Sequence, residues 1–135
     1  MSGTDHSQQP PPLELTFPPD PAQLAPVRAA LRSWLGRSGL SRRAATDVLI
    51  AAGEACANAV EHGLRNATGQ IRLTAEVSVT RLRLTIRDSG RWQPAQRRGE
   101  PYRGYGIRLM RTLMHRVDIH RSADGTTVEM QRRIG

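Results

Sequence analysis

The stretch Gly53-Glu-Ala-Cys-Ala-Asn-Ala-Val-Glu-His-Gly63 decides how the rest of this chain is organised. It lies within a run of helix-forming residues that starts near Ser41, and its apolar residues recur at the spacing of one buried helix face. Three polar residues interrupt this pattern on a common edge: Glu54, Asn58 and His62 are each four positions apart, or about one helical turn. A carboxylate and a carboxamide placed in this way can face a single ion or phosphate group.

Small residues surround this polar edge. A glutamate and an asparagine four positions apart are by themselves common on solvated helix surfaces. Here alanine and glycine lie on nearly every side of them, at Ala51, Ala52, Gly53, Ala55, Ala57 and Ala59. Because a glycine inside a helix costs about 1 kcal/mol relative to alanine, Gly53 indicates a packing or ligand-binding requirement.

Length and composition predict a single domain. We expect residues 1–11 to be a disordered leader and residues 12–135 to form the domain. The chain has no apolar run approaching the roughly 18 residues of a membrane helix, so we expect a cytoplasmic protein without a membrane span. The single cysteine, Cys56, falls on the apolar face of the central helix and is expected to be a core residue rather than a nucleophile.

The charge is strongly basic and unevenly distributed. All 20 basic residues are arginine, and the formal net charge is +8. From Arg91 to the end, ten arginines stand against four acidic residues, so six of the eight net charges lie in the last third. Such a field attracts anions, and nucleic acid, an acidic protein surface and a polyphosphate all qualify. Composition does not choose among them.

The remaining patterns predict a small sheet covered by helices. The expected elements, in order, are a strand at 13–17, a helix at 20–36, the central helix at 41–63, strands at 71–79 and 82–86, a mobile loop at 91–105, a helix that opens with Gly104-Tyr105-Gly106, and strands at 117–120 and 126–130. Ser41 is expected to cap the central helix and Gly63 to end it in a left-handed conformation. This order predicts one sheet with helices packed on one face.

Three segments need a common explanation. They are the Glu54/Asn58 helix edge, Asp88-Ser89-Gly90 at the end of a strand, and Gly104-Tyr105-Gly106 at the start of a helix. A glycine-flanked helix start presents free N–H groups to phosphate. A carboxylate at a strand end, beside a glycine, suits hydrogen bonding to the exocyclic amine of a flat ring. Each motif alone is common, but together they predict a nucleotide site.

In this order the segments resemble the N box and the two glycine boxes of the gyrase/heat-shock chaperone/histidine kinase/mismatch-repair ATPase superfamily. They resemble more closely the bacterial anti-sigma-factor serine/threonine kinases of the sporulation and stress-response type. The matching segments are Gly53 to Gly63, Arg87-Asp-Ser-Gly-Arg-Trp92, Gly104-Tyr-Gly-Ile-Arg-Leu-Met-Arg-Thr-Leu-Met114 and Asp124-Gly-Thr-Thr-Val128. The resemblance covers nearly the whole chain, from Leu13 to Arg133.

This resemblance implies an α/β fold of the Bergerat ATP-binding type: an α+β two-layer sandwich with a mixed, mostly antiparallel sheet and about three helices on one face. It implies ATP and Mg²⁺ as cofactors. Glu54 would be the general base or an orienting carboxylate, and Asn58 would coordinate the Mg²⁺ bound to the phosphates.

The resemblance also assigns the remaining site residues. Asp88 would bind the adenine amino group, Gly90 would let the ring approach, and Thr126 or Thr127 would add a hydroxyl near Asp88. His62, at the end of the N box, would have a supporting role. Gly104 and Gly106 would hinge the lid and cradle phosphate, and Tyr105 and Ile107 beside them would also bind the cofactor. The lid itself could take its positive charge from Arg91, Arg97, Arg98 and Arg103.

The implied function is phosphorylation of a serine on an anti-anti-sigma protein by a kinase homodimer that also sequesters a sigma factor. An alternative is a nucleotide-sensing regulatory module, related to versions fused to phosphatases, that binds a partner without efficient transfer. Trp92, which stands where the family usually has a second glycine, favours this alternative. Nucleic-acid binding is a third class, disfavoured because Arg72, Arg83 and Arg87 alternate as on an ordinary solvated strand face.

Overall fold

The computed structural model describes residues 9–66, 69–89 and 102–134. The elements, in chain order, are β1 (Leu13–Phe17), the short 3₁₀ helix η1 (Pro21–Gln23), α2 (Leu24–Leu35), α3 (Arg42–Asn66), β2 (Ile71–Val77), β3 (Arg81–Asp88), α4 (Tyr102–Leu113), β4 (Arg116–Ser122) and β5 (Gly125–Arg133). No helix within these ranges is long and apolar enough to cross a lipid bilayer.

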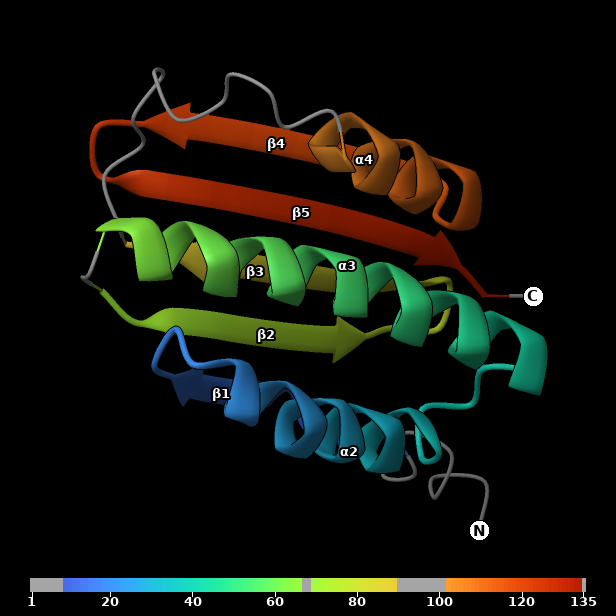
Figure 1. Cartoon of the computed structure of the whole chain (residues 1–135). Helices are drawn as coiled ribbons and strands as arrows, with labels where there is room; N and C mark the ends of the chain where they lie inside the picture. Colours follow the sequence, from blue (N-terminus) through green and yellow to red (C-terminus); the bar gives the residue numbers. More distant parts are fainter. Residues whose placement is uncertain (1–8, 67–68, 90–101, 135) are drawn as a thin grey trace, which may run out of the picture.

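The strands form one five-stranded sheet in the order β1-β2-β3-β5-β4. Helices α2, α3 and α4 cover the same face of this sheet, with the long helix α3 running across its middle, α2 towards the β1 edge and α4 towards the β4 edge (Figure 1). The prediction of a two-layer α/β sandwich is therefore confirmed.

All four strand pairings among the described residues are antiparallel, so the expectation of a mixed sheet is wrong for this part of the chain. Short turns join β2 to β3 and β4 to β5, and connections of that length join only antiparallel neighbours.

The core lies between α3 and the central strands. Inward positions alternate with solvated ones along β2 and β3, as the sequence predicts. The largest fully buried side chains are Trp34, Leu31, Ile71, Leu73, Leu82, Leu84, Ile86, Met110, Met130 and Val48. Burial of these groups supplies the main driving force for holding the helices on the sheet.

The first predicted helix begins differently from expectation. Asp20 caps a turn as predicted, accepting the backbone N–H of Ala22 at 2.9 Å, but that turn is the 3₁₀ helix η1 rather than α-helix. Pro26 accounts for this difference, because it has no N–H to donate and its ring crowds the carbonyl four residues earlier. The α-helical geometry therefore starts only at Leu24.

The predicted start of α3 is confirmed and its predicted end is wrong. The Ser41 hydroxyl accepts a backbone N–H of the first turn at 3.1 Å. The helix then continues through Gly63 to Asn66. A Cβ on Gly63 would stand 2.4 Å from the Cβ of Pro19, so this glycine is required for close packing. Among the described residues that follow this helix, Gly69 has a left-handed backbone, with a φ of 86°.

Two other boundaries shift. Strand β2 ends at Val77, which leaves Val79 in the turn with 71% of its surface exposed. Helix α4 begins at Tyr102, so Gly104 and Gly106 lie inside its first turns rather than at its start. The predicted loop before it lies outside the described residues up to position 101.

Candidate nucleotide site

One cavity collects residues from four of the predicted segments. It lies between α3, α4 and the strands β3, β4 and β5, and the predicted residues in its wall are Asn58, His62, Asp88, Ile107 and Thr126. The other residues of the wall are Ala55, Ala59, Ile86, Met110, Ile119, Arg121 and Val128. A few polar groups above an apolar floor are typical of a site for a flat, polar ring.

Asp88 reaches this cavity because it occupies the next inward position of β3 after Ile86. Its carboxylate is buried, with 5% of the residue exposed, and Oδ2 lies 3.4 Å from Nδ1 of His62 on α3. His62 therefore contacts the residue that the sequence assigns to adenine. This contact is consistent with the auxiliary role expected for His62, because an imidazole beside the Asp88 carboxylate restrains the orientation of that carboxylate.

Gly106 brings α4 against the polar edge of α3. A Cβ on this glycine would stand 3.0 Å from Oε1 of Glu54 and 3.6 Å from Nδ2 of Asn58. Alanine at this position would press on the carboxylate, so glycine is what permits the present approach of the two helices. The second glycine box and the N box thus meet in space, 48 residues apart in the sequence (106 − 58).

Glu54 does not line the cavity itself. It lies one turn before Asn58 and borders a groove of about 300 Å³ between α2 and α3, together with Arg28 and Ile50. A Cβ on Gly106 would lie close to both Glu54 and Asn58, and Asn58 lines the cavity, so the Glu54 carboxylate lies near the boundary between the cavity and this groove. A group arriving through the groove can reach Glu54 without passing through the cavity.

The structure separates the two threonine candidates. Thr126 is paired with Asp88 across the β3–β5 ladder and lines the cavity. Thr127 is paired with Arg87 and His120, and so points to the opposite, solvated face of the sheet. Of the two alternatives, the structure therefore brings Thr126 to the cavity and leaves Thr127 outside its wall, because successive residues of a strand point to opposite faces.

Some predicted residues are not placed by the structure. Gly90, Arg97 and Arg98 lie outside the described residues, as do Arg91 and Trp92. The backbones of Gly104 and Tyr105 belong to the first turn of α4.

Two features were missed by the sequence analysis, one beside the cavity and one in its wall. Gly125 adopts a φ of 145°, and a Cβ there would stand 2.0 Å from the backbone oxygen of Asp88, so this glycine lets the β4–β5 turn pack on the end of β3. Arg121 adds a guanidinium to the wall. Strand alternation through Val117 and Ile119 would have predicted its inward position.

The cavity has a volume of about 60 Å³. Ile107 and Met110 contribute its wall on the α4 side.

The donor set fits a nucleotide-bound Mg²⁺ better than a metal held by protein groups alone. Among the described residues, no three His, Cys, Asp or Glu side chains cluster in a way that could hold a metal ion. Mg²⁺ is commonly bound through one or two protein oxygens together with substrate phosphates and water. Asn58, at the junction of the cavity and Gly106, offers one such oxygen.

Cys56 takes no part in this chemistry. The thiol is buried, and burial raises its pKa to about 12. It is therefore a protonated core group at neutral pH, as the sequence predicts.

Comparison with known proteins agrees with this geometry. The sequence pattern of the histidine kinase-like ATPase domain matches residues 17–132, and the chain belongs to this family. The chain is 31% identical over 134 residues to the serine-protein kinase RsbW of Bacillus licheniformis, covering 87% of this chain and 83% of the relative. The corresponding protein of Bacillus subtilis is 29% identical, with 87% and 82% covered.

Solved structures show the same fold. The RsbU and RsbW domains of a Mycobacterium tuberculosis protein align with a TM-score of 0.75 and 28% identity over 93% of this chain. The present chain spans only 33% of that solved chain. The histidine kinase domain of a blue-light-activated kinase from Erythrobacter litoralis aligns with a TM-score of 0.60 over 84% of this chain, at 24% identity.

Proposed function

We propose that this chain is an ATP-dependent serine/threonine protein kinase that also acts as an anti-sigma factor. The observation that carries the proposal is the junction at Gly106, where the Glu54 carboxylate and the Asn58 amide meet beside a cavity that ends at Asp88. Kinases need alignment and charge neutralisation more than covalent catalysis, and this junction offers a base, a metal ligand and a ring-binding carboxylate. The curated relatives named as serine-protein kinases support the same assignment.

Each residue has a separate task in this proposal. Asp88 accepts a hydrogen bond from the adenine amino group, and Thr126 adds a hydroxyl beside it. Asn58 would hold Mg²⁺; ATP would supply the phosphoryl group, and the ion would neutralise the charge of the phosphates. Glu54 accepts the proton of the acceptor serine, which reaches it from the groove between α2 and α3.

The partners follow from the same family. We propose that the acceptor serine belongs to an anti-anti-sigma protein, that a sigma factor is the second partner, and that the kinase is cytoplasmic, where ATP is supplied. We also propose that the kinase is a homodimer. Sedimentation equilibrium tests the dimer.

The kinase assignment is tested with labelled ATP, Mg²⁺ and a candidate anti-anti-sigma protein. Glu54→Gln keeps the shape of the side chain but removes the base, so we expect transfer to fall by about a hundredfold or more while ATP binding remains. Asn58→Ala should abolish the stabilisation by ATP-Mg²⁺, which at a hundred times the dissociation constant amounts to about 2.7 kcal/mol. Glu76→Ala, on the exposed sheet face, is the matched control.

The outcomes separate the alternatives. Transfer that is unaffected by Glu54→Gln contradicts the catalytic role. Tight ATP binding without transfer to any candidate partner identifies the nucleotide-sensing module instead. Absence of any response to millimolar ATP contradicts both functions.

A further inference from the structure

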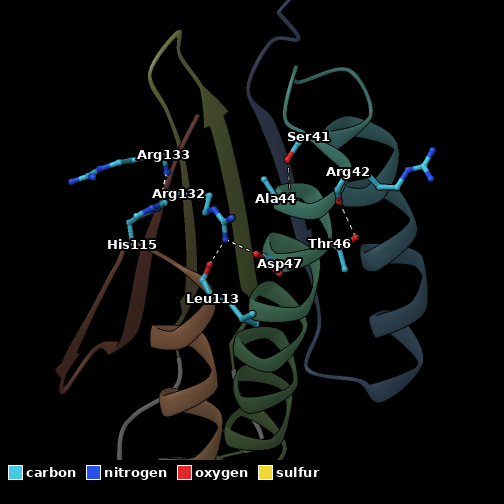
Figure 2. A network of polar contacts seen from close by, with 9 residues as sticks. All are labelled: Ser41, Arg42, Ala44, Thr46, Asp47, Leu113, His115, Arg132 and Arg133. Atoms are coloured by element: carbon cyan, nitrogen blue, oxygen red, sulfur yellow. Dashed lines mark hydrogen bonds and ion pairs between the residues drawn. The ribbon is translucent and has the colours of Figure 1, made fainter. Parts of the chain in front are cut away.

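A second concave surface lies where α3 begins. Two adjoining cavities, of about 670 Å³ and 450 Å³, share His115, Arg132 and Arg133 in their walls. The first extends to Ser41 and Ala44 at the start of α3, and Figure 2 shows these two residues facing the arginine cluster. Ala44 precedes Asn58 of the nucleotide site by 14 residues of one helix, about 21 Å at 1.5 Å per residue. We call the walls of these two cavities the basic surface.

The basic surface has an excess of positive charge. Four arginines contribute to its walls, Arg81, Arg116, Arg132 and Arg133, and neither cavity has an acidic residue in its described wall. The nearby carboxylates are already engaged: Asp47 accepts a hydrogen bond from Nη1 of Arg132 at 2.7 Å, and Asp118 accepts one from Nε of Arg116 at 2.7 Å. Arg133 forms no ion pair with another described residue, so its charge remains available to a partner.

The start of α3 adds to this field. Two arginines, Arg42 and Arg43, follow the Ser41 cap, and the first turn contains no acidic residue. Helix N-termini carry partial positive charge, so basic residues there destabilise the helix and acidic ones stabilise it. An anionic partner bound at this position would compensate the unfavourable positive charge at the helix N-terminus.

His115 lies within the same positively charged environment. Its Nδ1 accepts the backbone N–H of Arg133 at 2.9 Å. Desolvation, together with the charges of Arg132 and Arg133, lowers the pKa of His115. The ring is therefore neutral at physiological pH, and carboxylates bound nearby would raise its pKa again.

The shape of the surface favours one class of anion. Leu40, Ala44 and Ile134 give the first cavity an apolar side. No Phe, Tyr or Trp contributes to either described wall, so the surface lacks the stacking platform that single-stranded nucleic acid uses. A second copy of the chain would bring arginines against arginines.

We propose that the basic surface docks an acidic segment of a partner protein. Carboxylates of the segment meet Arg81, Arg116 and Arg133, and an apolar side chain enters beside Leu40 and Ile134. This binding is independent of nucleotide, so its failure would leave the proposed kinase function intact.

Fluorescence anisotropy with a labelled peptide of alternating glutamate and leucine tests the proposal in the absence of ATP. The Arg81→Glu/Arg133→Glu variant should weaken binding by about tenfold or more, since each reversal replaces an attraction by a repulsion. The Arg72→Glu/Arg87→Glu variant, on the exposed sheet face, changes the net charge equally and should alter affinity less than about twofold. Circular dichroism checks that both variants fold, and glutamine replacements serve if either does not.

Two further probes define the ligand class. The same peptide with glutamine in place of glutamate should not bind, and an oligonucleotide of equal negative charge should bind more weakly. The His115 ring resonance, followed by NMR against pH, should show a raised pKa with the acidic peptide. No binding at low salt, equal loss in both double variants, or tighter binding of the oligonucleotide through Arg81 and Arg133 would overturn the proposal.

Discussion

Replacing Gly106 by alanine tests how closely α4 must approach α3 for Glu54 to act. The added Cβ would stand 3.0 Å from Oε1 of Glu54, whereas ordinary contact begins at 3.4 Å, so the carboxylate must retreat by about 0.4 Å. The contact with Nδ2 of Asn58, at 3.6 Å, is ordinary and requires no movement. A misplacement of 1 Å can cost about a hundredfold in rate, and scaling this logarithmically predicts roughly a sixfold loss of phosphoryl transfer.

The free energy of unfolding of the Gly106→Ala variant should not fall. Alanine in place of a glycine inside a helix raises the free energy of unfolding by up to about 1 kcal/mol. Crowding of the Glu54 carboxylate reduces this gain. We therefore expect an unchanged or slightly raised free energy of unfolding by urea titration and reduced transfer, with ATP affinity measured in parallel to account for any loss of phosphate binding. Gly53→Ala is the control for the higher helix propensity of alanine, because its Cβ would contact only Nη1 of Arg28, at 3.8 Å. Unchanged transfer in a stable, ATP-binding Gly106→Ala protein would refute the argument that Glu54 must stay in place.

Three other glycine positions give predictions of stability. Gly125→Ala should destabilise by about 2–4 kcal/mol, because it combines positive-φ strain with a Cβ only 2.0 Å from the backbone oxygen of Asp88. Gly39→Ala, with a φ of 87° and nothing within 4 Å, isolates the strain and should cost about 1–2 kcal/mol. Gly63→Ala should cost a net 1–2 kcal/mol or so, because its Cβ would overlap Pro19. Urea denaturation measures all three, and equal losses for Gly125→Ala and Gly39→Ala would contradict the clash.

The sequence predicts best where a single local rule applies. The alternation along β2 and β3, the Ser41 cap and the apolar face of α3 each follow from spacing alone, and each is confirmed. The end of α3 was predicted wrongly because a sequence does not show why a glycine is needed. The glycine can provide a left-handed backbone, or it can allow close packing. Only the position of Pro19, far away in the sequence, shows which reason applies to Gly63.

The candidate site shows the same limit. Spacing correctly places Glu54, Asn58 and His62 along one edge of α3. Each step of four residues also rotates by about 40°, so Asn58 and His62 line the cavity while Glu54 turns towards the α2–α3 groove. Which of these side chains faces the cavity depends on where α4 packs against α3. Neither residue spacing nor composition predicts the distance between these two helices.

Arg132 connects the basic surface to α4, and Asp47 provides a way to separate its two roles. The guanidinium donates from Nη1 both to Asp47 and to the backbone oxygen of Leu113, the last residue of α4 (Figure 2). The Asp47 and Arg132 side chains are only 20% and 19% exposed, so this ion pair contributes more than a solvated one. Substitution of Arg132 itself would disturb the basic surface and the anchoring of α4 together.

Asp47→Asn keeps Arg132 and the shape of its partner but removes one negative charge from beside the surface. We expect the free energy of unfolding to fall by about 1 kcal/mol, because an ion pair becomes a hydrogen bond from the guanidinium to a neutral amide oxygen. We expect affinity for the acidic peptide to rise by about twofold, because a competing carboxylate is gone. Asp118→Asn makes the same charge change at the exposed pair with Arg116 and should leave stability unaltered. If peptide affinity instead falls together with stability in Asp47→Asn, the arginine cluster serves to join α3, α4 and β5, and the docking role is wrong.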